Sequence, residues 1–322
     1  MVKKIAIVGV GSWGVNHVKT CAILRAEGLI EDIIIMDARE NRAKYVATIY
    51  GTDWTTSYDN ILNDDEIDGV IIASPTKLHY EQTKKALIAG KHVLVEKPMA
   101  ENSSQARELV DLAHNEKRIL MTGFLLRCSP AVGYVKELYM RNKEFFGDVL
   151  LMYSKRVTPY PSRELDVGVI KDLAIHDIDL ATYIFNAKPR RVFGVGRKIL
   201  ASYETISVII SEYELNDATF NVIIEASWIA PYKFRRFEIT TTKTVISLDL
   251  IFHSVEIFAN DGIMKPKLTL KEPLYELDKN FILSIDGKKK PIVTGEDGYR
   301  ALLVCDKIIE SITKNSVVEI PE

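Results

Sequence analysis

The stretch Ile5-Ala-Ile-Val-Gly9-Val-Gly11-Ser-Trp-Gly14 decides the fold of this chain. Its first four residues form a continuous apolar run, which is typical of a strand buried on both faces of a parallel sheet. The glycines have the Gly-x-Gly-x-x-Gly spacing, and the pattern after them predicts a helix at 12–27. Gly9 allows a tight turn, Gly11 lets a pyrophosphate approach the backbone, and Gly14 lets the helix pack against the strand. The start of the helix would offer N–H groups and partial positive charge to the phosphates.

An acidic residue follows the second apolar run. Residues 33–36 are apolar and are followed by Asp37, which should accept hydrogen bonds from the adenosine ribose. We therefore predict that the chain binds NAD, because a 2′-phosphate would meet the negative charge of Asp37. Arg39 leaves room for NADP. The alternative is a glycine-rich turn without a ligand, but the strand, the helix and the acid around the motif argue against it.

The bulk properties bound the class of protein. A chain of 322 residues favours about two domains with a large core. It has 42 Lys and Arg against 44 Asp and Glu, so nothing electrostatic favours nucleic acid or an anionic membrane as partner. Its three cysteines are far apart and lack CxxC spacing, so we predict neither a disulfide framework nor a metal site. We find no secretory signal and no apolar run near ~18 residues, and we expect a cytoplasmic protein.

The order of the patterns predicts two domains. Strand and helix patterns alternate up to residue 123, which indicates a Rossmann domain at 1–123 with a doubly wound parallel sheet. Asp37, Ser74 and Glu96-Lys97 each follow a predicted strand, so they should face one ligand crevice at the carboxyl ends.

From residue 149 the patterns are mostly strands joined by short turns, with helices at 172–185 and 296–313. They predict an α+β domain at 124–322 with a large open, mostly antiparallel sheet. The C-terminal helix could pack back on the first domain. A second subunit commonly covers such a sheet, so we expect a homodimer or homotetramer.

Two segments carry side chains suited to proton transfer. Lys97 can hydrogen-bond a substrate hydroxyl and a ribose hydroxyl together, or it could simply cap a surface turn. Asp172 and His176 are four residues apart on a predicted helix and share one face. A carboxylate beside an imidazole suits acid–base work at neutral pH. An exposed helix ion pair or a metal ligand are the alternatives there. Asp179 extends the same face, and we interpret Asp177 as structural.

These motifs in combination resemble the Gfo/Idh/MocA oxidoreductases. They are the glycine fingerprint, Ala73-Ser-Pro-Thr76 with His79, Glu96-Lys-Pro98, and Asp172-Leu-Ala-Ile-His-Asp-Ile-Asp179. The resemblance covers nearly the whole chain and implies nicotinamide-dependent oxidation or reduction of a sugar or cyclitol hydroxyl. It implies that His176 is the base, that Asp172 orients it, and that Lys97 holds the reacting hydroxyl or takes the proton itself. The implied cofactor contacts are Gly9, Gly11, Ser12, Trp13, Gly14, Asp37, Arg39, Ser74, Pro75, Thr76, His79, Glu96, Lys97 and Arg127.

A narrower resemblance lies in 123–132, 154–163 and 166–172, which are similar to the UDP-N-acetylglucosamine 3-dehydrogenase branch. Cys128 and Ser129 depart from that branch, where an aromatic residue and Asn are expected. The branch implies NAD-dependent oxidation of the C3 hydroxyl of a UDP-N-acetylhexosamine. Arginine forks match phosphate oxygens, and tyrosine can stack on uracil or sugar. The substrate residues expected on this basis are Arg156, Tyr160, Arg163, Asp172, His176, Lys233 and Arg235.

Other interpretations stay open. The 156–163 segment could be a proline-stiffened loop with solvated arginines. The chain could oxidise a free sugar or inositol, in which case that loop has no phosphate to bind. It could also be a non-catalytic dinucleotide-binding regulatory protein, although such a module has no need for Lys97, Asp172 and His176.

Overall fold

The computed structural model describes residues 2–162, 165–216 and 218–321. The chain divides into two compact units, Met1–Leu125 with Glu272–Arg300, and Leu126–Lys271 with Ala301–Glu322. We expected the second domain to comprise the whole of 124–322, whereas Glu272–Arg300 belongs to the first unit. No helix among the described residues is long and apolar enough to cross a bilayer.

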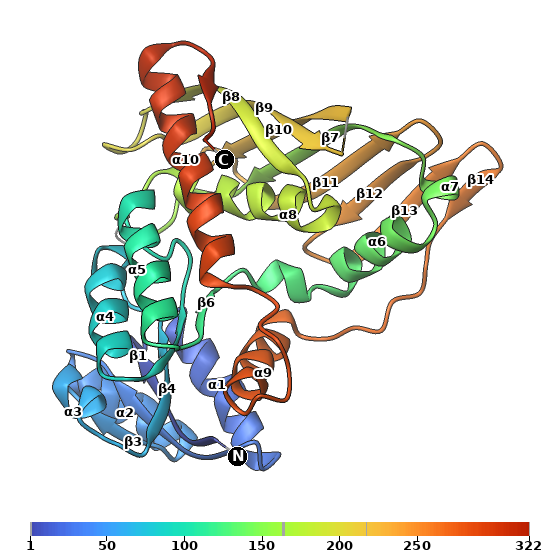
Figure 1. Ribbon diagram of the computed structural model, residues 1–322. Coiled ribbons are helices and arrows are strands. Elements are labelled where there is room, and N and C mark those ends of the chain that lie inside the picture. Colours follow the sequence, from blue (N-terminus) through green and yellow to red (C-terminus); the bar gives the residue numbers. More distant parts are fainter. Residues whose placement is uncertain (1, 163–164, 217, 322) are drawn as a thin grey trace. The chain divides into compact units, whose positions relative to one another are not determined.

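The first unit is built on a six-stranded parallel sheet with the order β3-β2-β1-β4-β5-β6, as predicted for a Rossmann domain (Figure 1). Its strands are β1 (Val2–Val8), β2 (Ile30–Met36), β3 (Asp53–Thr55), β4 (Ile67–Ile72), β5 (His92–Val95) and β6 (Leu120–Thr122). Its helices are α1 (Gly14–Ala26), α2 (Glu40–Tyr50), α3 (Tyr58–Leu62), α4 (Thr76–Ile88), α5 (Ser103–Asn115) and α9 (Pro273–Ile285). The four apolar residues that open the glycine motif are 0% exposed in β1, as expected for a strand covered on both faces.

Helix α9 is absent from the sequence-based prediction. It begins at Pro273, and the Glu272 carboxylate caps it by accepting a hydrogen bond from the Tyr275 N–H at 2.6 Å. Gly69 of β4 makes room for the helix, because a Cβ at Gly69 would lie 3.2 Å from the ring of Phe281. α9 packs against α1 and β4 and so belongs to the first unit.

The second unit is built on a nine-stranded, mostly antiparallel sheet with the order β14-β13-β12-β11-β7-β10-β9-β8-β15. Its strands are β7 (Val149–Val157), β8 (Lys188–Arg197), β9 (Ile206–Leu215), β10 (Ala218–Ser227), β11 (Phe234–Thr241), β12 (Val245–Asp249), β13 (Ser254–Ala259), β14 (Gly262–Met264) and β15 (Val318–Glu319). Only β7 and β10 pair in parallel among the described neighbours. The helical segments are the 3₁₀ turn η1 (Leu125–Cys128), α6 (Pro130–Arg141), α7 (Lys143–Phe146), the π-helical turn η2 (Ile170–Ala174) and α8 (Ile175–Phe185). Helix α10 (Gly295–Lys314) begins in the first unit and belongs to the second unit from Ala301 onward.

Helices cover one face of this sheet (Figure 1). An aromatic chain connects them to it: Tyr139 of α6 meets Phe185 of α8 at a ring-centroid distance of 5.2 Å, and Phe185 meets Phe220 of β10 at 5.2 Å. Such edge-to-face contacts stabilise a core beyond the area that they bury. The other face remains exposed, as the alternating burial of β9 shows.

A buried ion pair joins α8 to the sheet. Arg156 of β7 is 2% exposed, and its Nε and Nη2 donate to the two carboxylate oxygens of Asp177 at 2.7 and 2.8 Å. Asp177 is 0% exposed, in agreement with its interpretation as structural. Arg156 is therefore a core residue in this structure, and its guanidinium is not available to a substrate phosphate as expected from the sequence. The physical reason is that a buried carboxylate requires a cationic partner.

We predict that Arg156→Ala lowers the free energy of unfolding by about 3–5 kcal/mol, because it leaves the Asp177 carboxylate buried and uncompensated. Denaturant unfolding followed by circular dichroism measures the change. The matched control is Arg191→Ala, which breaks an exposed 2.8 Å pair with Glu212 and should cost about 0–1 kcal/mol. Equal losses from the two variants would contradict the assigned role.

Candidate active site

The glycine loop between β1 and α1 has the geometry that a diphosphate requires. Gly9 has φ of +84°, and a Cβ there would come within 2.7 Å of the Ser74 backbone. A Cβ at Gly14 would overlap the carbonyl oxygen of Gly9, so α1 packs directly on the loop. At Gly11, however, a Cβ would meet only the tip of Arg39, at 4.0 Å. The backbone at Gly11 is therefore open to a ligand, which fits the binding of a dinucleotide at this turn.

Asp37 lies at the carboxyl end of β2 and is 6% exposed. Its carboxylate accepts the N–H groups of Val10 at 3.2 Å and Arg39 at 3.0 Å, and Arg39 Nε donates to it at 3.0 Å. Burial alone would raise the pKa of Asp37, but these donors and the Arg39 charge lower it below the ordinary value. The ionised carboxylate can accept ribose hydroxyls and repels a 2′-phosphate, as predicted for NAD.

Arg42 of α2 supports the loop and was missed by the sequence analysis. Its Nε donates to the carbonyl oxygen of Val10 at 2.7 Å, and its Nη2 donates to that of Gly11 at 3.1 Å. These bonds hold the loop carbonyls on the side of α2. No motif in the sequence marks this arginine, because the contact depends on how α2 packs.

His79 of α4 contacts two loops of the first unit through hydrogen bonds. It is 2% exposed, and its ring nitrogens lie 2.8 Å from the carbonyl oxygens of Pro98 and Ser74. We expected His79 to contact the cofactor, whereas here it positions the Ser74-Pro75-Thr76 turn relative to the segment after β5. Ser12 and Trp13, also expected at the cofactor, are exposed at the start of α1.

Lys97 follows β5 and is half-buried. The preceding Glu96 is 6% exposed, and its Oε2 accepts the Lys97 N–H at 3.2 Å. The peptide bond between Lys97 and Pro98 is cis. Gly123 after β6 makes room for Glu96, since a Cβ there would lie 2.6 Å from its carboxylate. The backbone that carries Lys97 is thus fixed by a buried carboxylate at a strand end.

Asp172 and His176 lie on one helical segment of the second unit, but not on the regular α-helix that we predicted. Asp172 belongs to the π-helical turn η2, and His176 lies in the first turn of α8. Both side chains are half-buried, and Nδ1 of His176 is fully buried. Lys171 fixes the turn through an ion pair of 2.7 Å with Asp306 of α10. Residues four apart remain neighbours on such a segment, and π-helical turns often occur at functional sites.

Arg127 was expected at the cofactor, but its guanidinium is engaged within the second unit. Arg127 is 6% exposed and donates twice to the Asp179 carboxylate, from Nη2 at 2.6 Å and from Nε at 3.0 Å. The guanidinium also lies over the Tyr183 ring, 4.6 Å from its centroid. Asp179 therefore anchors α8 to η1 and does not extend the catalytic face.

Four of the predicted substrate residues remain to be placed: Tyr160, Arg163, Lys233 and Arg235. Tyr160 is 41% exposed, with its ring 6.2 Å from that of Trp228, and Lys233 is exposed before β11. Arg163 lies outside the described residues. Arg235 of β11 stands directly opposite Arg156 of β7. Burial, and then the charge of Arg156, lower the pKa of Arg235 below its ordinary value, while Asp177 and Asp172 act in the opposite direction.

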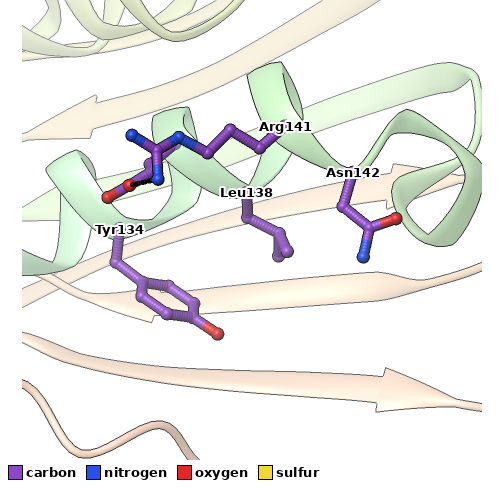
Figure 2. A pocket seen from close by; sticks show the side chains of 5 residues that line it. Tyr134, Leu138, Arg141 and Asn142 are labelled. Carbon is purple, nitrogen blue, oxygen red and sulfur yellow. Dashed lines mark ion pairs between the residues drawn. The ribbon is translucent and has the colours of Figure 1, made fainter.

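A shallow depression elsewhere in the second unit contains none of the predicted residues. It lies along α6, where Tyr134, Leu138 and Arg141 line it together with Asn142 (Figure 2). Arg141 forms an exposed ion pair of 2.8 Å with Glu137. Its walls include neither the glycine loop nor Lys97, Asp172 or His176, so we do not place the active site there.

Two family models match this chain. The model described as oxidoreductase family, NAD-binding Rossmann fold, matches residues 3–124, and the model of the GFO/IDH/MocA C-terminal domain matches residues 131–247. The UDP-N-acetylglucosamine 3-dehydrogenase of Acidithiobacillus ferrooxidans is 29% identical over 79% of this chain and 76% of that protein. Inositol 2-dehydrogenase of Rhizobium meliloti is 24% identical over 99% of this chain and 100% of that protein.

Solved structures agree in fold. The structure of the Acidithiobacillus ferrooxidans enzyme matches with a TM-score of 0.86 at 24% identity, covering 98% of this chain and 99% of that one. Levoglucosan dehydrogenase in complex with NADH matches with a TM-score of 0.88 at 21% identity, covering 99% of each chain. The chain therefore belongs to the Gfo/Idh/MocA family and is an NAD-binding oxidoreductase of the sugar and polyol type.

Proposed function

We propose that this protein oxidises the C3 hydroxyl of UDP-N-acetylglucosamine or a related UDP-N-acetylhexosamine with NAD. The observation that carries the substrate proposal is Arg235. Its Nε is buried and has no hydrogen-bond partner within the described part of the chain. A buried donor of this kind requires an acceptor, and a diphosphate supplies one with the matching charge. The name of the Acidithiobacillus ferrooxidans relative supports the same substrate.

His176 is the proposed base. Its imidazole accepts the proton of the substrate hydroxyl, and the Asp172 carboxylate one turn earlier orients the ring and stabilises the imidazolium that forms. The Lys97 ammonium holds the reacting oxygen and can share its proton. Bound NAD supplies the hydride acceptor. The protein thus contributes orientation and proton handling, and the product is a 3-keto sugar nucleotide.

A second candidate is the oxidation of a free sugar or inositol, which the match to inositol 2-dehydrogenase favours. The two substrates make different demands on the second unit. A free cyclitol has no phosphate, so Arg235, Lys233 and Tyr160 would have nothing to bind beyond the ring. Variants of Arg235, Lys233 and Tyr160 therefore distinguish the two proposals, whereas variants of Lys97, Asp172 and His176 do not.

The catalytic role predicts that His176→Ala lowers kcat by about 10²–10⁴-fold, because the hydroxyl proton loses its acceptor. The affinity for NAD, measured by calorimetry, should not change. His114→Ala is the matched control, since His114 is exposed on α5, and it should retain full activity. Unimpaired turnover by His176→Ala would remove the assigned base.

The substrate role predicts that Arg235→Gln raises KM for UDP-N-acetylglucosamine about 10–100-fold, because a charge-assisted hydrogen bond to phosphate is lost. The neighbouring Arg236→Gln is the control, because Arg236 is exposed on the opposite face of β11. Initial rates over a substrate series measure both. If KM is the same for both variants, or only inositol or a free sugar is oxidised, the second candidate is preferred.

We also propose that the exposed face of the nine-stranded sheet binds a second copy of the chain. Tyr153 and three apolar side chains form a row across four strands, because Tyr153 pairs with Ile223, Ile223 with Ile210, and Ile210 with Phe193. Val208 and Val195, next along β9 and β8, are 44% and 53% exposed. A self-complementary patch of this kind suits a two-fold interface.

This interface predicts that the wild-type chain is at least a dimer by size-exclusion chromatography with light scattering, and that Ile210→Lys dissociates it. A lysine in the centre of the row would have to be buried without a partner. Ile49→Lys on α2, where Ile49 is 54% exposed, is the control and should leave the oligomer intact. A monomeric wild type at micromolar concentration would refute the proposal.

A further inference from the structure

A histidine in the first unit lies between two buried carboxylates. Nδ1 of His17 is 2.9 Å from Oδ1 of Asp278, and Nε2 is 3.1 Å from Oε1 of Glu96. His17 and Asp278 are 0% exposed, and Glu96 is 6% exposed. An ionised carboxylate only accepts hydrogen bonds, so both contacts are satisfied together when each ring nitrogen of His17 carries a proton. The arrangement is therefore a buried imidazolium that is hydrogen-bonded to a carboxylate at each ring nitrogen.

Three distant segments supply this cluster. His17 lies in the first turn of α1, directly after the glycine loop, and Glu96 follows β5. Asp278 comes from α9, the helix of the first unit that follows β14 in sequence. Thr20 also donates to Asp278, which leaves this carboxylate fully engaged. α9 is thus more than a packing element, because it brings the second anion to His17.

The charges around His17 favour its protonated form. Burial alone would lower the pKa of His17, but Asp278 and then Glu96 raise it to about 10. Burial alone would raise the pKa of Glu96, but His17, then Trp13 and Lys97, lower it. Cys21 of α1 also faces Asp278. On the elements that pack against α1, Asp278 and Glu96 are the described charges that act on His17.

We propose that His17 is a positioning residue for the Glu96-Lys97 segment. Its positive charge keeps the Glu96 carboxylate ionised and fixes one of its oxygens, so that the other oxygen accepts the Lys97 N–H at 3.2 Å. The backbone from which the Lys97 ammonium extends is held in place through this chain of contacts. His17 touches neither cofactor nor substrate in this role. The inference rests on the proposed catalytic role of Lys97, and its tests separate the two.

The first test does not depend on activity. The chain has six histidines, so ¹³C-labelled histidine gives few ring signals, and His17→Gln identifies the signal of His17. We expect this ring to remain protonated at pH 8, where an ordinary histidine is neutral. The same protonation should make the stability depend on pH. A pKa raised from 6.5 to about 10 contributes stability that is complete below pH 6.5 and is lost as the pH rises through 10. A ring that titrates near pH 6.5 would overturn the proposal.

The second test uses the pH dependence of catalysis. Without the imidazolium, burial should raise the pKa of Glu96, and its protonated form would hold the Lys97 N–H less firmly. The ratio of kcat/KM of His17→Gln to that of the wild type should therefore rise about 10-fold or more between pH 6 and pH 9. Asp278→Asn removes the larger of the two charges that raise the pKa of His17 but leaves Glu96 beside the ring. The ring should still be protonated at pH 6, where Glu96 needs it, so the ratio for this variant should change less than about threefold. His114→Gln is the control with a ratio near one.

The outcomes distinguish a positioning role of His17 from a role in folding alone. A purely structural role lowers the activity of His17→Gln by the same factor at every pH, and that result would overturn the proposal. If His17→Gln does not fold, Glu96→Gln in the same labelled protein should lower the pKa of His17, and an unchanged pKa would overturn it too. If no sugar is oxidised, the proposed function fails independently of this inference. The comparison of His17→Gln with the wild type between pH 6 and pH 9 is then made on the dissociation constant of NADH instead of kcat/KM.

Discussion

The structure depends on one constraint, namely that a charge withdrawn from water must meet an opposite charge. Lys97 and His176, which we propose to carry out chemistry, are each adjacent in sequence to a carboxylate in a buried ion pair. Lys97 follows Glu96, which contacts the His17 imidazolium. His176 precedes Asp177, which Arg156 engages from the sheet. Such pairs are weak contributors to net stability, but breaking one is costly, so they fix the geometry around them.

The predictions from the sequence that succeeded rest on local signals. The alternation of apolar runs, the glycine spacing and the acid after the second strand are local signals, and they predicted the parallel sheet and most strands of the second unit. The exposed row of apolar side chains on the open sheet likewise follows from the period-two pattern of each strand. These features could be read because each depends on neighbours in the sequence.

The features that were missed depend on contacts between distant residues. An arginine beside a loop is equally compatible with a phosphate ligand and with a core ion pair, and only the structure shows that Arg156 meets Asp177 and that Arg127 meets Asp179. His17 carried no signal of its own, since its partner Asp278 is 261 residues away. The π-helical turn at Asp172 also lies in a segment that is tied to a distant helix, because Lys171 pairs with Asp306 at 2.7 Å.

The covered face of the large sheet contains two like charges that the buried ion pairs do not fully balance. Arg156 and Arg235 are directly opposite on neighbouring strands, where like charges repel. Asp177 gives both of its oxygens to Arg156, so the second guanidinium has only the more distant charge of Asp172 and Asp177 to balance it. A neutral side chain at position 235 would relieve this repulsion at no cost to the core. An anion beside Arg235 would offset this repulsion, and this is why we propose a phosphorylated substrate at this position.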